Sequence, residues 1–317
     1  FAPSVQTQWR HIMSEMKYDP SMFEKLDESE KNDEAIAMES KTFLQDTWRR
    51  FCSNKLAILG LVVLVIMILL AVFVPVFSQY TYDGQDLANT NALPSAAHLL
   101  GTDKLGRDIL VRICSGMRVT LAIGFTSAAI NLCIGIVYGG CAGYFGGRVD
   151  MTMMRIVDII DSVPSLLYTI MILKVFGNSV FSMMLAISLT SWITMARQVR
   201  AQVMSLKEME FAMAAKVIGC SDLRILLKHL VVNALGPIIV CLTMMIPSAI
   251  FTESSLSFIG IGIQPPACSL GSLANEARQL INTQPLQVVW PVITIALITL
   301  SLNFIGDGVG EALEAKR

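Results

Sequence analysis

Long uncharged stretches alternate with short polar connections along this chain. No charged residue occurs between Leu56 and Phe77 or between Val119 and Gly147. At about 1.5 Å per residue, a helix of either length can cross a hydrocarbon core roughly 30 Å thick. The pattern predicts an all-α integral membrane protein. Its six expected transmembrane helices lie at about residues 56–77, 118–143, 152–173, 179–198, 231–252 and 286–306.

The third of these spans is interrupted by polar residues. Asp158, Asp161 and Pro164 fall inside it, and a proline within a helix removes a hydrogen bond and bends the helix. The polar residues 1–48 are expected to form a cytoplasmic tail, either simply solvated or used for docking. Residues 49–317 would then form the transmembrane domain.

Composition agrees with this division. Hydrophobic residues make up 54% of the chain and charged residues only 15%, with a mean hydropathy of +0.59, which is too apolar for an ordinary soluble domain. Lys and Arg residues are more frequent on the side of the N-terminus, beginning with Arg49, Arg50 and Lys55. Because cytoplasmic loops carry such an excess, we expect both termini and the 199–230 loop in the cytoplasm.

The 199–230 loop has its own helical pattern. Apolar residues recur at helical spacing twice, on either side of Gly219, as Phe211, Ala214, Ala215 and Ile218 and then as Leu223, Leu226, Leu227 and Leu230. This predicts two short amphipathic helices. Gly219 suits the left-handed end of the first helix, and Ser221 or Asp222 can cap the second. The pair could lie on lipid or dock on a protein, and the small alanines favour protein contact.

Signatures of an enzyme are missing from the sequence. There is no GxxxxGK[ST] phosphate loop for ATP and no HExxH metal motif. His11, His98 and His229 are far apart in the expected topology, and the seven cysteines include no CxxC pair. We therefore expect neither catalysis nor a metal site nor a cofactor in this chain.

Charged residues inside the predicted spans are candidates for a functional role because they are costly in lipid. Asp158 lies three residues from Arg155, so a local ion pair accounts for it. Asp161, one turn deeper, has no such neighbour. Glu253 lies near the outer end of the fifth span. Asp161 and Glu253 could line a polar passage, or they could cap helices and form hydrogen bonds between them.

Several motifs in order resemble the dipeptide/oligopeptide/nickel branch of bacterial ABC importer permeases, and in particular its C-type oligopeptide permeases. In the loop, Ala214, Ala215 and Gly219 have the spacing of the family's EAA motif, while Met213 replaces its glutamate and Glu210 lies one turn earlier. Similar segments occur elsewhere, namely "HLLGTDKLGRDILVRICSGMRVTL", "AGYFGGRVDMTMMRIVDIIDSVPSLL", "FTESSLSFIGIGIQPP" and "LNFIGDGVGEAL". The likeness spans roughly residues 45–313.

The resemblance implies a type I ABC importer permease fold in the bacterial plasma (inner) membrane. It further implies a second, homologous permease chain, two cytoplasmic ATPase subunits that bind ATP and Mg, and an extracytoplasmic peptide-binding protein. The loop would be the coupling-helix region, with Glu210, Ala214, Ala215, Gly219 and Asp222 as the residues that couple to the ATPases. The chain would also contact membrane lipid, and it would not bind nucleic acid.

Oligopeptides are the expected cargo. Nickel chelate or another small solute is the nearest alternative, because "ARQLINTQPLQ" resembles nickel permeases. A stand-alone channel or secondary transporter would work without ATPases. An exporter permease would need no external binding protein.

Overall fold

A computed structural model describes residues 43–314. The chain divides into two units, residues 1–43 and residues 44–317. Apart from Phe43, all residues described here belong to the second unit. Most of the predicted tail, residues 1–42, therefore lies outside the described residues. The described residues are helical apart from connecting loops and one isolated bridge between Thr102 and Asp108.

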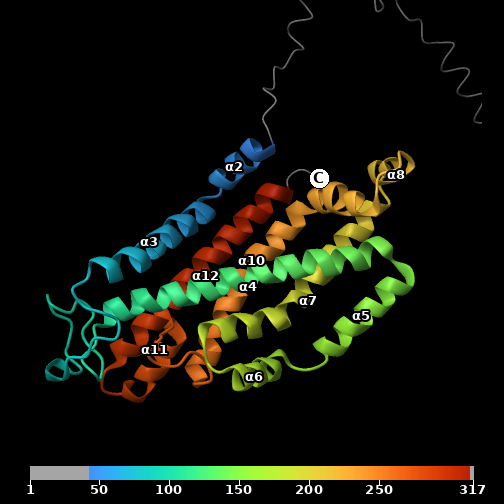
Figure 1. Cartoon of the computed structure of the whole chain (residues 1–317). Coiled ribbons are helices and arrows are strands. Elements are labelled where there is room, and N and C mark those ends of the chain that lie inside the picture. The colour runs from blue at the N-terminus through green and yellow to red at the C-terminus, as the bar shows by residue number, and fades with distance from the viewer. Residues whose placement is uncertain (1–42, 315–317) are drawn as a thin grey trace, which may run out of the picture. The chain divides into compact units, whose positions relative to one another are not determined.

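The helices follow one another along the chain with short connections (Figure 1). Those long and apolar enough to cross a membrane are α3 (Lys55–Phe77), α4 (Ile109–Phe145), α7 (Val180–Lys207), α10 (Leu235–Ile259) and α12 (Pro285–Glu314). The other α-helices are α2 (Phe43–Ser53), α5 (Gly147–Asp161), α6 (Ser165–Phe176), α8 (Glu210–Val217), α9 (Asp222–Arg224) and α11 (Leu270–Ala277). The short elements are η2 (Leu87–Asn89), the π-helical turn η3 (Ile225–Val231) and η4 (Arg278–Leu280).

Two helices extend beyond the spans expected from sequence. Helix α4 begins at Ile109 instead of residue 118, because Asp108 caps it by accepting from the backbone N–H of Val111 at 2.9 Å. Helix α7 continues to Lys207, so it includes the first part of the predicted 199–230 loop. In both helices the extra turns carry polar residues that a hydropathy pattern assigns to loops.

The third predicted span is two helices. α5 and α6 are bent by 78° at residues 162–164 and pass as a membrane span only together. Pro164 precedes α6, and a proline at this position cannot donate the hydrogen bond that would continue α5. The interruption expected within 152–173 is therefore a break between two helices, and the expected bend at Pro164 is confirmed.

A stripe of glycines on α4 brings its backbone against α7. A Cβ added at Gly139 would lie 2.2 Å from the carbonyl oxygen of Ala196, and one added at Gly135 would lie 2.3 Å from Cγ of Met195. Gly143 is similarly close to Arg200. Small residues four apart allow this approach between helices in lipid. Because the residue numbers rise together in both helices, α4 and α7 run parallel.

The parallel arrangement establishes the number of crossings. For α7 to start at the same end as α4, α5 and α6 together must return the chain across the bundle. The start of α3 and the end of α12 lie at one end, where Asn54 Nδ2 donates to Glu311 at 2.7 Å. Figure 1 shows α8 and α2 near this end and α11 near the other. The described part of the chain therefore runs along the bundle six times, with α5 and α6 together as the broken third pass, and its helices give five candidate membrane spans, or six if this bent pair is one span.

Candidate functional site

The predicted turn between the two loop helices is present at Gly219. Its φ is +87°, the left-handed conformation that glycine adopts without penalty. The N–H of Cys220 donates to the carbonyl of Ala215 at 3.1 Å, and that of Gly219 donates to Lys216 at 3.0 Å. This pair of bonds is the Schellman arrangement that ends a helix. Gly219 thus ends α8 and redirects the chain into α9 and η3.

One side of the 208–231 loop is packed on the membrane helices. Ala212 and Ala215 of α8 are buried in a cluster with Val199 and Val203 of α7. The buried side chains of η3 belong to the same cluster. The hydroxyl of Tyr144, in the last turn of α4, donates to Asp222 Oδ1 at 2.6 Å. The loop is therefore joined to both α4 and α7.

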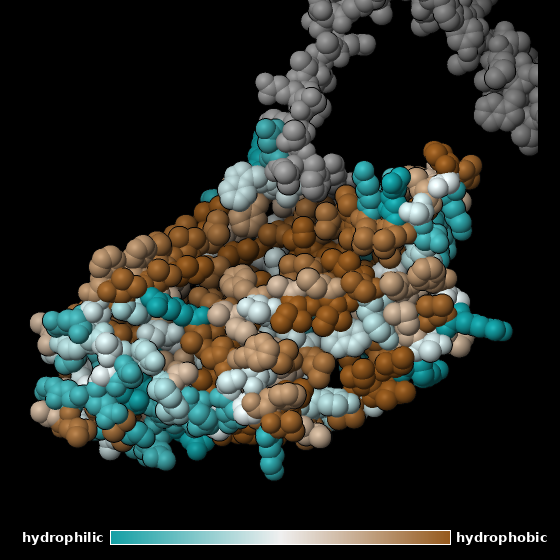
Figure 2. All heavy atoms as spheres, in the orientation of Figure 1, coloured by the Kyte–Doolittle hydropathy of each residue, from teal (hydrophilic) through white to brown (hydrophobic). Residues whose placement is uncertain are grey.

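The opposite side of the same loop presents apolar side chains to the exterior. Val217 is 87% exposed, Ile218 is 82% exposed and Leu223 is 67% exposed. Met209 and Met213 are exposed as well. In Figure 2, hydrophobic atoms cover the projecting tip at the place of α8 in Figure 1. We call these five residues the outer face of the loop.

The structure corrects which loop residues share a face. Phe211, Ala214, Ala215 and Ile218 were predicted to share one apolar face, but Ala215 is buried together with Ala212, while the other three are exposed. In the second half, Leu226 and Leu230 are buried while Leu223 and Leu227 are exposed. η3 has the wider turns of a π-helix, so residues at α-helical spacing no longer point the same way. Ser221 precedes α9 but makes no capping bond through its side chain.

The expected coupling residues differ in their surroundings. Glu210 is exposed in the first turn of α8. Ala214 is exposed and Ala215 is buried. Gly219 is exposed and forms the turn, and Asp222 is tied to α4. The structure thus places all five on one short segment, on both of its faces.

A cavity of about 500 Å³, lined by both polar and apolar side chains, opens among α5, α6, α7 and α10. Most of its polar lining consists of hydroxyl groups, those of Ser165, Thr169, Thr190, Ser191, Thr194, Ser248, Thr252 and Ser255. Several donate to a carbonyl of their own helix, as Thr252 does to Ser248 at 2.8 Å. Such a hydroxyl keeps lone pairs that can accept a hydrogen bond from a ligand.

Asp161 is the carboxylate that lines this cavity. It accepts from Arg197 Nη1 at 2.8 Å, and Asp158 accepts from Arg197 Nη2 at 3.1 Å. The guanidinium thus joins the end of α5 to α7, while about half of each side chain remains exposed. The expected pairing of Asp158 with Arg155 is wrong, because Arg197 is the ion-pair partner of Asp158.

Glu253 lies elsewhere. Its side chain is fully buried, and it is absent from the lining of the cavity. Its carboxyl group has hydrogen-bond partners on α4 and α10, namely Thr120, Ser254 and Ser257. Of the two interpretations of Glu253, hydrogen bonding between helices accounts for these contacts and lining of this cavity does not.

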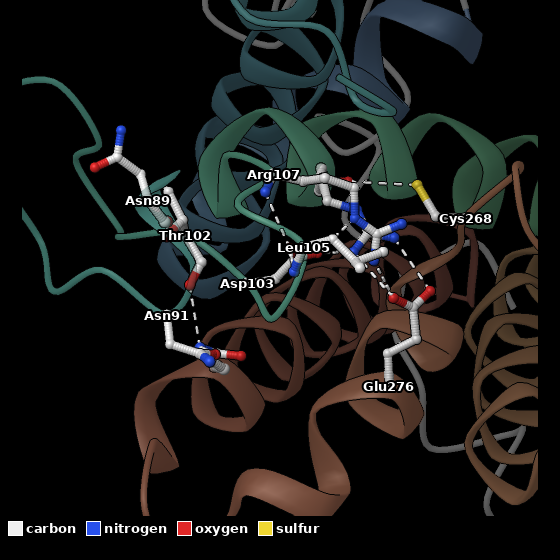
Figure 3. A network of polar contacts seen from close by, with 10 residues as sticks. Asn89, Asn91, Thr102, Asp103, Leu105, Arg107, Cys268 and Glu276 are labelled. Atoms are coloured by element: carbon white, nitrogen blue, oxygen red, sulfur yellow. Dashed lines mark hydrogen bonds and ion pairs between the residues drawn. The ribbon is translucent and has the colours of Figure 1, made fainter. Parts of the chain in front are cut away.

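An ion-pair network closes the opposite end of the bundle (Figure 3). Arg107 binds Asp103 and Glu276 at 2.6 Å each, and Arg112 binds the same two carboxylates at 2.5 and 3.0 Å. Burial alone would raise the pKa of both carboxyls. Hydrogen bonds and the two guanidinium charges outweigh that effect, so the pKa values of Asp103 and Glu276 are lowered. This network was not predicted, because Glu276 lies 164 residues from Arg112 along the chain.

Comparison with known proteins identifies the class. Residues 131–317 match the family model described as binding-protein-dependent transport system inner membrane component. This match covers more than half of the chain, so the chain belongs to that family and is a permease subunit of an ABC importer. Residues 42–94 match the N-terminal transmembrane domain of oligopeptide transport permease C. The resemblance found in the motifs is thereby confirmed.

The curated relatives narrow the branch. The chain is 40% identical over 296 residues to an oligopeptide transport system permease protein of Bacillus subtilis, covering 93% of this chain and 97% of that protein. It is 40% identical to a dipeptide transport system permease protein of the same species, covering 90% and 91%. The Escherichia coli oligopeptide permease is 38% identical, covering 89% and 94%.

Among solved structures, the inward-facing methionine ABC transporter MetNI is similar, with a TM-score of 0.48 and 18% identity. The match covers 62% of this chain and 94% of that chain.

Proposed function

We propose that this chain forms half of the passage of an ATP-driven importer for oligopeptides. The names of its relatives support this cargo, since permeases for oligopeptides and dipeptides match it over about nine-tenths of its length. The chain would pair with a second permease subunit in the bacterial plasma membrane. An extracytoplasmic peptide-binding protein would deliver the cargo.

ATP hydrolysis would take place on two cytoplasmic ATPase subunits, which bind ATP and Mg. The sequence of this chain has no phosphate loop. The observation that carries the proposal is the outer face of the 208–231 loop, whose apolar side chains are exposed at a rigid, projecting tip. A helix that presents such residues is typical of helix-in-groove recognition.

The two sides of the loop suggest how movement would be transmitted. A displaced ATPase would carry the outer face with it. The buried side of the loop would pass that displacement to α7 through Ala215 and to α4 through the hydrogen bond between Tyr144 and Asp222. Both helices contribute to the bundle around the cavity, which would thereby open to one side of the membrane or the other.

The hydroxyl-lined cavity is the proposed contribution of this chain to the passage, with Asp161 and Arg197 at its edge. Lone pairs on the hydroxyls would accept from backbone N–H groups of any peptide, so this surface would favour peptides without selecting their side chains. Glu253 is left out of the proposed passage.

The loop end would face the cytoplasm, and the ion-pair network would face outward. The start of α3 and the end of α12 lie at the loop end, so both ends of the transmembrane domain would be cytoplasmic. The excess of Lys and Arg on this side agrees with that orientation.

Gly219→Val tests the proposed coupling. A Cβ at this position would meet no atom within 4 Å, so the substitution acts only through the strained left-handed backbone. We expect the variant to insert normally and the complex to hydrolyse ATP, with peptide uptake into proteoliposomes lost. Gly219→Asn is the matched control, because asparagine tolerates the left-handed conformation, and it should retain uptake.

Normal uptake by the valine variant would overturn the coupling proposal. Uptake of nickel chelate instead of peptide, by the wild-type complex with its binding protein, would reassign the cargo and leave the coupling intact. Transport by the purified chain without ATPases would overturn both.

A further inference from the structure

A carboxyl group is buried in the outer part of α10 without a cation. Glu253 is 0% exposed. Its Oε1 lies 2.7 Å from Ser257 Oγ, and its Oε2 lies 3.1 Å from Thr120 Oγ1 and 3.3 Å from Ser254 Oγ. These three partners, and the Ser269 side chain that also interacts with the carboxyl group, are neutral hydroxyls, whereas the carboxylates of the ion-pair network face arginines.

The charged groups of the neighbouring elements are engaged elsewhere. On α4, Arg112 binds Asp103 and Glu276, and Arg118 donates to the carbonyls of Ala71 and Val72. Glu276 is the charged residue of α11, and the loop before this helix, residues 260–269, contains no charged residue. The charges of α7 and α12 belong to the halves of those helices near the 208–231 loop. A carboxylate would therefore be buried with no compensating charge, which is strongly unfavourable.

The hydrogen-bond directions leave a place for a proton. The backbone N–H of Leu270 donates to Thr120 Oγ1 at 3.2 Å, so Thr120 can in turn donate its own hydroxyl proton to Glu253 Oε2. Ser257 Oγ has no other side-chain hydrogen bond among residues 43–314. A hydroxyl both donates and accepts, so Ser257 can accept from a protonated Oε1.

We propose that Glu253 is held as a neutral carboxylic acid, which donates to Ser257 and accepts from Thr120. Through Thr120 the acid fixes Leu270, the first residue of α11, against α4 and α10. The other end of α11 carries Glu276, which Arg107 and Arg112 hold. Glu253 is thus a positioning residue for α11, and this role does not depend on the identity of the cargo.

Infrared spectroscopy of the assembled transporter in lipid nanodiscs tests the protonation. The wild type minus Glu253→Gln difference spectrum should contain the C=O stretching band of a protonated carboxyl group, shifted in D2O, at neutral pH. Glu276→Gln is the matched control. It removes an ion-paired carboxylate, so its difference spectrum should contain only the two bands of an ionised carboxylate. Carboxylate bands alone in the Glu253 difference would overturn the proposal.

A second measurement remains valid if the variant does not assemble. In the wild type, a protonated-carboxyl band should persist at pH 8, where exposed Asp and Glu side chains are ionised. Its absence at that pH would also overturn the proposal.

Substitutions then test the positioning role. Glutamine is neutral and can donate and accept as the acid does, so Glu253→Gln should retain most of the wild-type melting temperature and peptide uptake. Glu253→Ala removes both functions and should lower both quantities. If glutamine were as damaging as alanine, the ionised form would be the one the structure needs, and the proposal would fail.

Discussion

The two ends of the bundle differ in whether their side chains find partners within the chain. At the end that contains α11, four charged side chains form ion pairs with one another within the chain and are largely buried. At the loop end, five large apolar side chains are left uncovered by the described residues of the chain. Figure 2 shows the same contrast, with hydrophilic residues gathered over the end that contains α11 and a hydrophobic tip at the other.

The difference indicates which end is stabilised within the chain and which end offers a surface for a partner. A buried charge left without its partner is strongly destabilising, and Asp103, Arg107, Arg112 and Glu276 pair with one another within this chain. Exposed apolar patches on a rigid tip mark an interaction surface. Residues of the ion-pair network should therefore matter for folding, and residues on the outer face of the loop should matter for assembly. Three substitutions separate these two kinds of effect.

Arg112→Leu should have the largest effect on stability. The Arg112 side chain is 4% exposed, and its loss leaves Asp103 and Glu276 to share Arg107. Removing one partner of a buried pair costs about 3–5 kcal/mol. Thermal unfolding of the purified chain in detergent should show a clearly lower melting temperature.

Arg197→Leu is the control, since it breaks an ion pair that is about half exposed, where such pairs contribute roughly 0–1 kcal/mol. Equal losses in the two variants would contradict the contrast between a buried and an exposed network. Acidification gives a further check. Asp103 and Glu276 have lowered pKa values, so their contribution is present above the ordinary values of 3.8 and 4.5 and is lost only as the pH falls below them.

The membrane helices were predictable because hydropathy is a local property. Uncharged runs located α3 and most of α4, and Pro164 located the bend. Gly219 was predictable from its spacing, because only a positive φ lets the chain turn there. The glycine stripe at 135, 139 and 143 is also visible in the sequence, as a repeated small residue every fourth position.

Contacts between distant segments were not predictable. Asp103 and Glu276 share the same two arginines only because α11 packs beside the start of α4. The spacing of residues along the chain does not predict that contact. Arg197 likewise reaches Asp158 and Asp161 from another helix. The shared apolar face of the second loop helix was predicted wrongly because a π-helical turn changes the spacing of side chains, and no local sequence pattern indicates that turn.

Gly139→Ala should have an intermediate effect and tests the interface that joins the two ends. The new Cβ would lie 2.2 Å from the carbonyl oxygen of Ala196, so α4 and α7 must separate. Overpacking of this kind costs about 1–3 kcal/mol, measurable as a lower melting temperature in detergent.

The neighbouring Gly140→Ala is the matched control for that separation. Its Cβ would have its nearest contact 3.4 Å away, on a Leu226 side chain, and alanine favours a helix by about 1 kcal/mol over glycine. We expect Gly140→Ala to be neutral or stabilising. A similar loss in both variants would show that the close approach of α4 and α7 is not what the glycine stripe provides.

Ile218→Ala should change stability least and assembly most. Ile218 is 82% exposed, so truncating it should alter the free energy of unfolding by no more than about 0.5 kcal/mol. If the outer face docks on an ATPase, the amount of ATPase that copurifies with the permease should fall. Leu230→Ala is the opposite case, because Leu230 is fully buried and its truncation should cost about 2–5 kcal/mol. A stable Ile218→Ala chain that retains its full complement of ATPase would remove Ile218 from the docking surface and narrow the contrast between the two ends.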